Sequence, residues 1–249
     1  MRLRGRLNVL ALVGASALVG GCAPGVPEHA WTDHDDALRI ISERARSVET
    51  LAGACRVVLH DPQGGSVTLD GAIAARPPDH LRLQGWKFAK KVLDLTVTPE
   101  GTWLEIGRDA GAGAEDRTAL AGLDAHRLAE AWALVTADVL AGGPVQINDA
   151  GGPTFEVCAK LPGQDQSVVY TVDRRTLTVT GCRVLDARGD VRHVMALDRY
   201  RLIDGIVWPT RVTGTSGARR FVLELSDVQL NGVLVPLAFV PPPRAVRQP

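Results

Sequence analysis

From Ala54 onward, apolar residues recur mainly at every second position, and no other feature of the sequence constrains the fold as much. Val57 and Leu59 are followed by Val67 and Leu69, and the segment between these pairs contains the proline and glycines that a hairpin turn needs. Such alternation predicts antiparallel strands with one apolar face and one polar face. Further strands are expected at 81–83, 93–97 and 103–106.

The second half of the chain repeats this pattern. Turn-forming segments such as 187–189, 204–205 and 216–217 separate its apolar runs. The fold class is therefore α+β and mainly antiparallel β, in one domain, since a single sheet domain often reaches about 200 to 250 residues. The strands are expected at 154–160, 166–173, 176–185, 191–202, 206–215 and 219–229.

Two segments have helical periodicity instead. In the first, Thr32 or Asp33 can cap the N-terminus, and apolar residues recur every three or four positions as far as Ala52. The second runs from about 124 to 141 and is ended by Gly142. Each helix has one apolar face, so we expect both helices to pack on the sheet. The glycine-rich segment 107–123 between sheet and second helix lacks periodicity and is expected to form a loop.

The N-terminal segment has the layout of a bacterial lipoprotein signal peptide. Arginines at positions 2, 4 and 6 precede an apolar run from Leu7, which ends in two glycines directly before Cys22. As a helix this run is about 22 Å long, which is short for a hydrocarbon core of about 30 Å. We expect cleavage before Cys22 and lipidation of Cys22 with acyl chains such as palmitate. Ordinary secretion is the alternative.

This interpretation divides the chain into four parts. Residues 1–21 form the signal peptide, 22–32 the lipidated N-terminus and linker, 33–240 the folded domain, and 241–249 a proline-rich tail that lies along the outside of the sheet. The full sequence has 28 basic and 28 acidic residues, and loss of the signal peptide removes only basic ones. A slightly acidic body gives no electrostatic reason to bind nucleic acid.

The sequence contains no motif for catalysis, a metal ion or a cofactor. Its histidines are scattered, and it has neither a nucleophile elbow nor a phosphate-binding loop. The cluster Asp33-His34-Asp35-Asp36 has metal-ligating side chains, but adjacent helical residues do not share a face, and acidic residues favour the first turn of a helix. We expect no catalytic residue, no metal and no cofactor, hence no enzyme. A hydrolase whose groups converge only in the fold is the alternative.

The cysteines give little further information. Cys55 lies in an apolar strand and is expected to be a small buried side chain. Cys158 and Cys182 are the pair closest in sequence, and an oxidising compartment would permit a disulfide between them. Whether their strands are neighbours does not follow from the sequence, so this pairing stays open.

The segment 84–91 combines two aromatic residues with lysines. Trp86 and Phe88 have the opposite parity to Leu81 and Leu83, so Gly85 marks an expected β-bulge. One interpretation is a hairpin tip that contacts lipid headgroups, where aromatic residues and lysines are favoured. The other is that both aromatic side chains belong to the core.

Three segments resemble those of the LolA/LolB family of lipoprotein carriers and receptors. They are Pro-Asp-His-Leu-Arg-Leu at 78–83, Leu-Asp-Leu-Thr-Val-Thr-Pro-Glu-Gly-Thr-Trp at 93–103, and Tyr-Arg-Leu-Ile-Asp-Gly-Ile-Val-Trp-Pro-Thr at 200–210. The resemblance covers most of residues 33–240. It implies a half-open antiparallel β-barrel whose concave side is covered by helices, with a role in handling lipids or lipoproteins.

The combination of a lipidation site with such a fold predicts a lipid-anchored protein of the cell envelope that holds an acyl chain or the lipid moiety of a lipoprotein. Because Ala23 rather than aspartate follows Cys22, the family rule favours the outer membrane, with the protein facing the periplasm. The alternative is an interaction or sensory protein that binds a protein partner. The sequence leaves the oligomeric state open. The expected ligand-binding residues are Trp86, Phe88, Leu93, Leu95, Trp103 and Trp132.

Overall fold

The computed structural model describes residues 25–107, 120, 125–137, 140, 144–161, 165–235 and 237–248. The signal peptide, Cys22 and most of the expected loop at 107–123 lie outside these residues. Within the described ranges, no helix is both long enough and apolar enough to cross a lipid bilayer.

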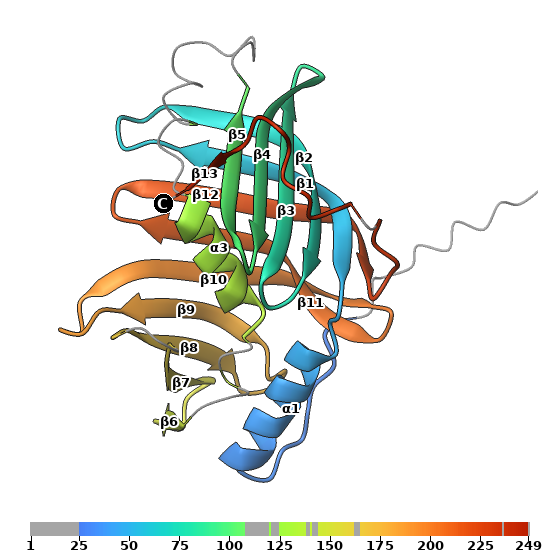
Figure 1. Cartoon of the computed structure of the whole chain (residues 1–249). Helices are drawn as coiled ribbons and strands as arrows, with labels where there is room; N and C mark the ends of the chain where they lie inside the picture. The colour runs from blue at the N-terminus through green and yellow to red at the C-terminus, as the bar shows by residue number, and fades with distance from the viewer. Residues whose placement is uncertain are drawn as a thin grey trace, which may run out of the picture.

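One antiparallel sheet forms the body of the protein (Figure 1). Its strands are β1 (Leu51–His60), β2 (Ser66–Arg76), β3 (His80–Lys87), β4 (Lys90–Thr98), β5 (Gly101–Ile106), β6 (Val145–Asn148), β7 (Thr154–Lys160), β8 (Ser167–Asp173), β9 (Val179–Leu185), β10 (Val191–Ile203), β11 (Ile206–Ser216), β12 (Arg219–Leu230) and β13 (Val246–Arg247). Their order in space is β13-β5-β4-β3-β2-β1-β12-β11-β10-β9-β8-β7-β6. Hairpins therefore account for most of the pairings, and β1 joins the two halves by pairing with β12.

Two helices accompany the sheet, α1 (His34–Arg46) and α3 (Ala125–Val135). The sheet curls around α3 without closing, because β13 and β6 stand at its two edges and no ladder joins them in the part of the chain that the structure describes. Figure 1 shows α3 between the β3–β5 part of the sheet and the β8–β10 part. The expected fold class, a mainly antiparallel half-open barrel with helices on its concave side, is confirmed.

Alternation decides which side of the sheet is buried. Leu69 in β2 and Leu95 in β4 are fully buried and belong to one apolar cluster, while Val157 in β7 and Tyr170 in β8 are fully buried in a second cluster. We call the face that carries these side chains the inner face, and the opposite one the outer face. The first cluster lies under β1–β5 and β12, and the second under β7–β11 with α1.

Helix α3 connects the two clusters. Its Trp132 packs in the first cluster and its Leu134 in the second, and both side chains are at most 5% exposed. An apolar helix in this position shields the inner face of both halves of the sheet from water. Positions 124 and 141, between which we expected this helix, and Gly142, which we expected to end it, lie outside the described residues.

Helix α1 begins where the sequence predicts. Asp33 is its N-cap, and the carboxylate accepts a hydrogen bond of 2.9 Å from the backbone N–H of Asp36. The helix ends at Arg46, however, and the apolar period that we extended to Ala52 is wrong beyond that point. Ala52 lies in β1, where its pairing with Gln229 of β12 replaces the helical hydrogen bonds.

Two short strands were not predicted, and the expected β-bulge lies in β4 rather than in β3. Strand β6 pairs with β7, and β13 in the proline-rich tail pairs with β5. The register between β3 and β4 shifts beside Gly85, but Gly85 lies opposite Leu93 and Trp86 opposite Lys91, so the extra residue is Val92 of β4. The bulge that we expected at Gly85 is therefore wrong in its strand, and β3 keeps its alternation. A Cβ at Gly85 would lie only 2.8 Å from Leu69 Cδ1 and 3.3 Å from Leu93 Cβ, so glycine permits these inner-face side chains to meet.

The cysteine pairing left open by the sequence is settled by register. Cys158 lies opposite Val169, whereas Cys182 lies opposite Tyr170, the next residue along β8. Successive residues of a strand point to opposite faces, so the two thiols lie on different sides of the sheet. Cys55, Cys158 and Cys182 are all free, and Cys55 is buried as expected.

Candidate functional site

An apolar cavity of about 40 Å³ lies between α3 and the inner face of the sheet. Leu128, Ala131 and Trp132 of α3 form one wall, and residues from β1, β2, β3, β11 and β12 form the other. Almost all of the lining surface is apolar, so the cavity offers dispersion contacts and exclusion of water but few hydrogen bonds. Its remaining lining residues are Val57, Ile73, Leu81, Leu83, Val135, Val212, Phe221 and Leu223.

Three of the six residues that we expected to line a ligand site are brought together under α3. Leu93 and Leu95 of β4 are at most 1% exposed and pack in the same cluster as Trp132. Of these three, Trp132 also lines the apolar cavity directly.

The other three expected residues lie elsewhere. Trp86 is paired with Asp70, whose exposed side chain lies on the outer face, so Trp86 is on that face as well. Trp103 is also on the outer face, where the Arg247 guanidinium lies 5.8 Å from its ring centroid. Phe88 is 79% exposed at the tip of the β3–β4 hairpin.

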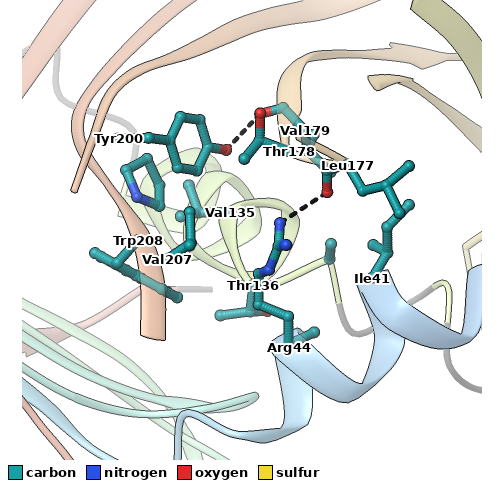
Figure 2. A pocket seen from close by; sticks show the side chains of 13 residues that line it. Ile41, Arg44, Val135, Thr136, Leu177, Thr178, Val179, Tyr200, Val207 and Trp208 are labelled. Carbon is teal, nitrogen blue, oxygen red and sulfur yellow. Dashed lines mark hydrogen bonds between the residues drawn. The ribbon is translucent and has the colours of Figure 1, made fainter. Parts of the chain in front are cut away.

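A second cavity, also of about 40 Å³, lies beside the first between α1, α3 and strands β9–β11 (Figure 2). Val135 lines both cavities. Unlike the first, the second cavity has polar groups in its wall: the Arg44 guanidinium, the hydroxyls of Thr136, Thr178 and Tyr200, and the indole of Trp208. Its other lining residues are Ile41, Ala45, Ala137, Leu177, Val179, Val207 and Pro209.

Arg44 reaches this cavity from the last turn of α1. Its Nη1 donates a hydrogen bond of 2.8 Å to the Leu177 carbonyl (Figure 2). Its Nη2 donates one of 3.3 Å to the Thr176 carbonyl. No carboxylate among the described residues forms an ion pair with it. Burial lowers the pKa of Arg44 from its usual range, because a cation removed from water is destabilised.

Tyr200 of β10 lines the same cavity as Arg44. Its hydroxyl donates a hydrogen bond of 2.5 Å to the Val179 carbonyl (Figure 2). Burial raises the pKa of Tyr200 well above its usual value, since the phenolate would be desolvated. The hydroxyl is therefore neutral at any pH near 7, and Arg44 is the charged group of this cavity.

Trp132 of the first cavity and Trp208 of the second lie next to each other. Their ring centroids are 6.2 Å apart, and each side chain is 5% exposed. Both indole Nε1 atoms are buried without a hydrogen-bond acceptor among the residues that the structure describes. A buried N–H without an acceptor costs free energy. The two indole N–H groups could therefore each donate a hydrogen bond to a bound ligand.

The sequence did not identify Arg44 or Trp208 as site residues. Arg44 resembles any basic residue in the last turn of a helix, where the helix dipole favours it. Trp208 lies with Thr210 and Val212 on the buried face of β11. Nothing in the sequence distinguished it from the other tryptophans. Both residues enter the site through contacts between segments far apart in sequence.

The outer face carries a separate polar cluster centred on Asp94. The Asp94 carboxylate is fully buried and accepts hydrogen bonds from Arg82 Nε at 2.6 Å, Lys91 Nζ at 2.7 Å and Gln84 Nε2 at 3.0 Å. Burial alone would raise the pKa of Asp94, but these hydrogen bonds together lower it below its usual value. Arg82 also donates to the carbonyls of Ala238 and Val240, so the cluster holds the C-terminal segment against the sheet.

The tip of the β3–β4 hairpin is exposed and basic. Phe88 and Ala89 have φ values of 50° and 60°, a left-handed conformation that residues other than glycine and asparagine rarely adopt. Lys87 Nζ lies 5.7 Å from the centroid of the Phe88 ring, and Lys90 is exposed beside it. Of the two interpretations of this segment, core burial is excluded for Phe88.

Among the described residues, no group of three or more histidine, cysteine, aspartate or glutamate side chains is arranged to hold a metal ion. His34, in the cluster considered as a metal site, instead places its Nε2 2.8 Å from the Asp149 carboxylate. That contact ties the start of α1 to the turn between β6 and β7.

Comparison with protein-family models gives no match, and comparison with curated protein sequences gives none either. Solved structures do match. A DUF1329 family protein from Desulfovibrio piger superimposes with a TM-score of 0.59 at 12% identity, over 81% of this chain and 94% of that one. A LolA superfamily protein from Nitrosomonas europaea gives a TM-score of 0.56 at 10% identity, over 79% and 94%.

A third match is a domain from Vibrio parahaemolyticus assigned to outer-membrane lipoprotein sorting. It has a TM-score of 0.54 and 12% identity, over 84% of this chain and 97% of that one. At such low identities the likeness concerns the path of the chain rather than its residues. The curled open sheet, the helix on its inner face and these matches together show that the protein has the LolA/LolB-like fold.

Proposed function

We propose that the protein binds an acyl chain, or the lipid moiety of a lipoprotein, between α3 and the inner face of the sheet. The observation that carries this proposal is the apolar cavity walled by Leu128, Ala131 and Trp132 of the helix. Each methylene group removed from water contributes about 0.8 kcal/mol, so an apolar site of this kind needs little polar chemistry to hold a chain.

The cavity volume implies that α3 moves when a chain binds. Ligand sites usually enclose about 300 to 1,000 Å³, whereas the cavity under α3 has about 40 Å³. In the empty state the side chains of α3 occupy the place of the ligand and keep the inner face dry. An incoming acyl chain would form its own apolar contacts with the inner face in place of those of α3. The free energy lost when α3 moves away is then offset by the burial of the chain.

The proposed anchor at Cys22 would hold this site close to a bilayer. The segment that follows Cys22 reaches the body early, because the His29 backbone N–H donates a 2.8 Å hydrogen bond to the Arg175 carbonyl. Trp31 Nε1 also donates to the Arg174 carbonyl at 2.9 Å. The free tether is therefore short, which favours a protein that works at the membrane surface. We place it in the cell envelope, with the outer membrane as the favoured location.

The β3–β4 tip supports a direct bilayer contact. A left-handed Phe88 with 79% exposure buries little surface and carries backbone strain, so folding stability does not explain it. Insertion of its ring at the level of the lipid headgroups, with Lys87 and Lys90 near anionic lipid, would explain both the residue type and its position.

A second candidate function is recognition of a protein partner in the envelope. The observation that favours it is an exposed apolar run in the C-terminal segment, where Val233, Val235 and Leu237 are 102%, 71% and 73% exposed. Apolar surface of this kind often marks an interaction site. Cross-linking of the lipidated protein in intact cells would support this function if one envelope protein is captured at 233–237 and lost when these residues are changed to serine.

The experiment that tests the lipid proposal is extraction of the lipidated protein from its native membrane in mild detergent, followed by mass spectrometry of bound molecules. We expect a stoichiometric acyl lipid in addition to the lipid on Cys22. The matched control is the Ala131→Leu variant, which fills the apolar cavity. Equal amounts of lipid on both proteins, or none on the wild type, would contradict the proposal.

A further inference from the structure

The second cavity, which we call the Arg44 cavity, has an unusual charge balance because its cation, Arg44, is half-buried beside apolar side chains. A guanidinium has five N–H donors, and two backbone carbonyls accept from Arg44. Carbonyl groups satisfy hydrogen bonds but do not neutralise a positive charge. Charges that are partly removed from water are usually paired. Arg44 is half-buried, and within the described ranges it has no carboxylate partner. The group that would complete the site is therefore an anion.

A second observation points to the same conclusion. Trp208 lines this cavity, is 5% exposed, and has a buried indole N–H without an acceptor among the described residues. An anionic oxygen in the cavity would pair with Arg44 and accept from Trp208 at the same time. Charge-assisted hydrogen bonds are about twice as strong as neutral ones, so one such group would relieve both deficits.

The position of the cavity restricts what carries the anion. The Arg44 cavity and the apolar cavity share Val135, and Trp208 of the one lies 6.2 Å from Trp132 of the other, measured between ring centroids. A ligand that fills both is amphipathic, with an acidic head beside Arg44 and an apolar tail beneath α3. The head must also be small: about 40 Å³ is available, and one water-sized group needs about 10 to 15 Å³.

We propose that the Arg44 cavity binds the carboxylate of a long-chain monocarboxylic acid whose alkyl chain lies in the apolar site under α3. This inference rests on the proposed acyl-binding function and adds the chemical class of the headgroup. Arg44 supplies the charge, Trp208 a directed donor, and the neutral Tyr200 hydroxyl a wall that does not repel an anion. A carboxylate has two oxygens, which matches the two kinds of donor.

The test compares ligands that share one chain and differ in the head. Binding of dodecanoate, dodecan-1-ol and dodecyl phosphate to the full-length lipidated protein is measured by calorimetry at pH 7.5, with acetate and inorganic phosphate as chainless anions. We expect dodecanoate to bind roughly ten- to hundredfold more tightly than dodecan-1-ol, the range of a charge-assisted hydrogen bond. Acetate and phosphate are expected to bind at least a hundredfold more weakly than dodecanoate, because the loss of only about four buried methylene groups costs about 3 kcal/mol.

Variants of Arg44 test whether this residue causes the preference for dodecanoate over dodecan-1-ol. In Arg44→Met, binding of dodecan-1-ol is expected to stay the same while the advantage of dodecanoate disappears, and Arg44→Lys is expected to restore part of it. Arg39→Met is the matched control, because Arg39 lies on the exposed face of the same helix and pairs with Asp36 and Glu43. Should Arg44→Met fail to fold, the indole ¹⁵N–H resonance of Trp208 in the wild type gives an independent measurement, since dodecanoate should shift it and dodecan-1-ol should not.

The possible outcomes distinguish the carboxylate site from the acyl-binding function on which it rests. Equal affinity for dodecanoate and dodecan-1-ol would overturn the carboxylate site and leave the acyl-binding function standing. No binding of any of the chain ligands would remove the proposed function itself. A preference for dodecyl phosphate over dodecanoate would assign the cavity to phosphate headgroups, and tight binding of acetate or phosphate alone would assign it to free anions. Either result would contradict the proposal.

Discussion

The indole rings of Trp132 in α3 and Trp208 in β11 contact each other with centroids 6.2 Å apart, and both indole N–H groups are buried without an acceptor in the described part of the chain. This contact joins the covering helix to the sheet at the point where the two cavities meet. A helix fixed only for stability would satisfy these donors or replace them with apolar residues. Their presence suits a helix that gives way to a ligand.

The first prediction concerns the space beneath α3. Ala131→Leu fills the apolar cavity and should weaken binding of a twelve-carbon acyl chain about tenfold, which corresponds to the lost burial of roughly two methylene groups. Ala133→Leu is the matched control, because Ala133 is half-buried on the same helix and lines neither cavity. Calorimetric titration of both variants checks this. Equal weakening in both would indicate a general disturbance of the helix.

The second prediction concerns Asp94. In Asp94→Asn, Arg82 and Lys91 lose their counter-charge, and we expect a loss of about 3 kcal/mol in the free energy of unfolding at pH 7, at the low end for a buried pair because Lys91 reaches solvent. Urea unfolding measures it. Glu156→Gln, which removes the partner of the exposed Arg183, should cost less than about 1 kcal/mol.

The same carboxylate predicts a pH dependence. The folded-state pKa of Asp94 is lowered, so its contribution to stability is fully present above its ordinary unfolded value of about 3.9 and is lost as the pH falls through the folded-state pKa. The stability difference between wild type and Asp94→Asn should therefore stay constant from pH 7 to pH 5 and shrink below pH 4. A constant difference down to pH 2 would show that the charge of Asp94 is not the cause.

The third prediction concerns the hairpin tip. Phe88→Asn places a residue that tolerates the left-handed conformation at this position and should raise the free energy of unfolding by about 1 kcal/mol. It should also weaken binding of the unlipidated protein to anionic vesicles about tenfold or more, because the ring no longer enters the interface. Val191→Asn, at another exposed apolar position, should leave vesicle binding unchanged. If the Phe88→Asn variant is more stable but binds vesicles as well as the wild type, the proposed contact between the hairpin tip and the bilayer is contradicted.

The fourth prediction concerns the anchor. Cys22→Ala should abolish metabolic labelling of the protein with palmitate and move it from the membrane fraction to the soluble fraction. Cys55→Ala is the control, since Cys55 is buried in the folded domain and should leave both properties intact. Persistent membrane association of a correctly processed, unlabelled protein would mean that another part of the chain provides the tether.

Much of the fold could be predicted from the sequence because side-chain alternation is a local property. The β7, β8 and β10–β12 bounds differ from the expected ones by at most about one residue, within the spread of assignment methods. Strands β6 and β13 were missed because two to four residues give too few alternations to recognise. The end of α1 was predicted too late because Ala52 pairs with β12 as part of β1. This pairing joins segments far apart in the sequence, so the local periodicity does not reveal it.

The site was predicted less well, for two different reasons. The outward position of Trp86 and Trp103 could have been found, because each has the opposite parity to the leucines of its own strand, Leu83 and Leu104. The role of Arg44 could not, because its partners Thr176 and Leu177 are more than a hundred residues away in sequence. We had chosen the aromatic residues by residue type alone. Strand parity would have excluded Trp86 and Trp103, whereas the contact between Trp132 and Trp208 depends on the tertiary structure.

The most direct test of the central claim is fluorescence quenching by a fatty acid that carries bromine on its alkyl chain, since bromine quenches tryptophan only at close range. Bound beneath α3, the chain should quench Trp132 and Trp208 and spare the outer-face Trp86 and Trp103. The quenched fraction should therefore fall in Trp132→Phe and Trp208→Phe and persist in Trp86→Phe and Trp103→Phe. Quenching that is lost instead with the two outer-face tryptophans would contradict a ligand site between α3 and the sheet.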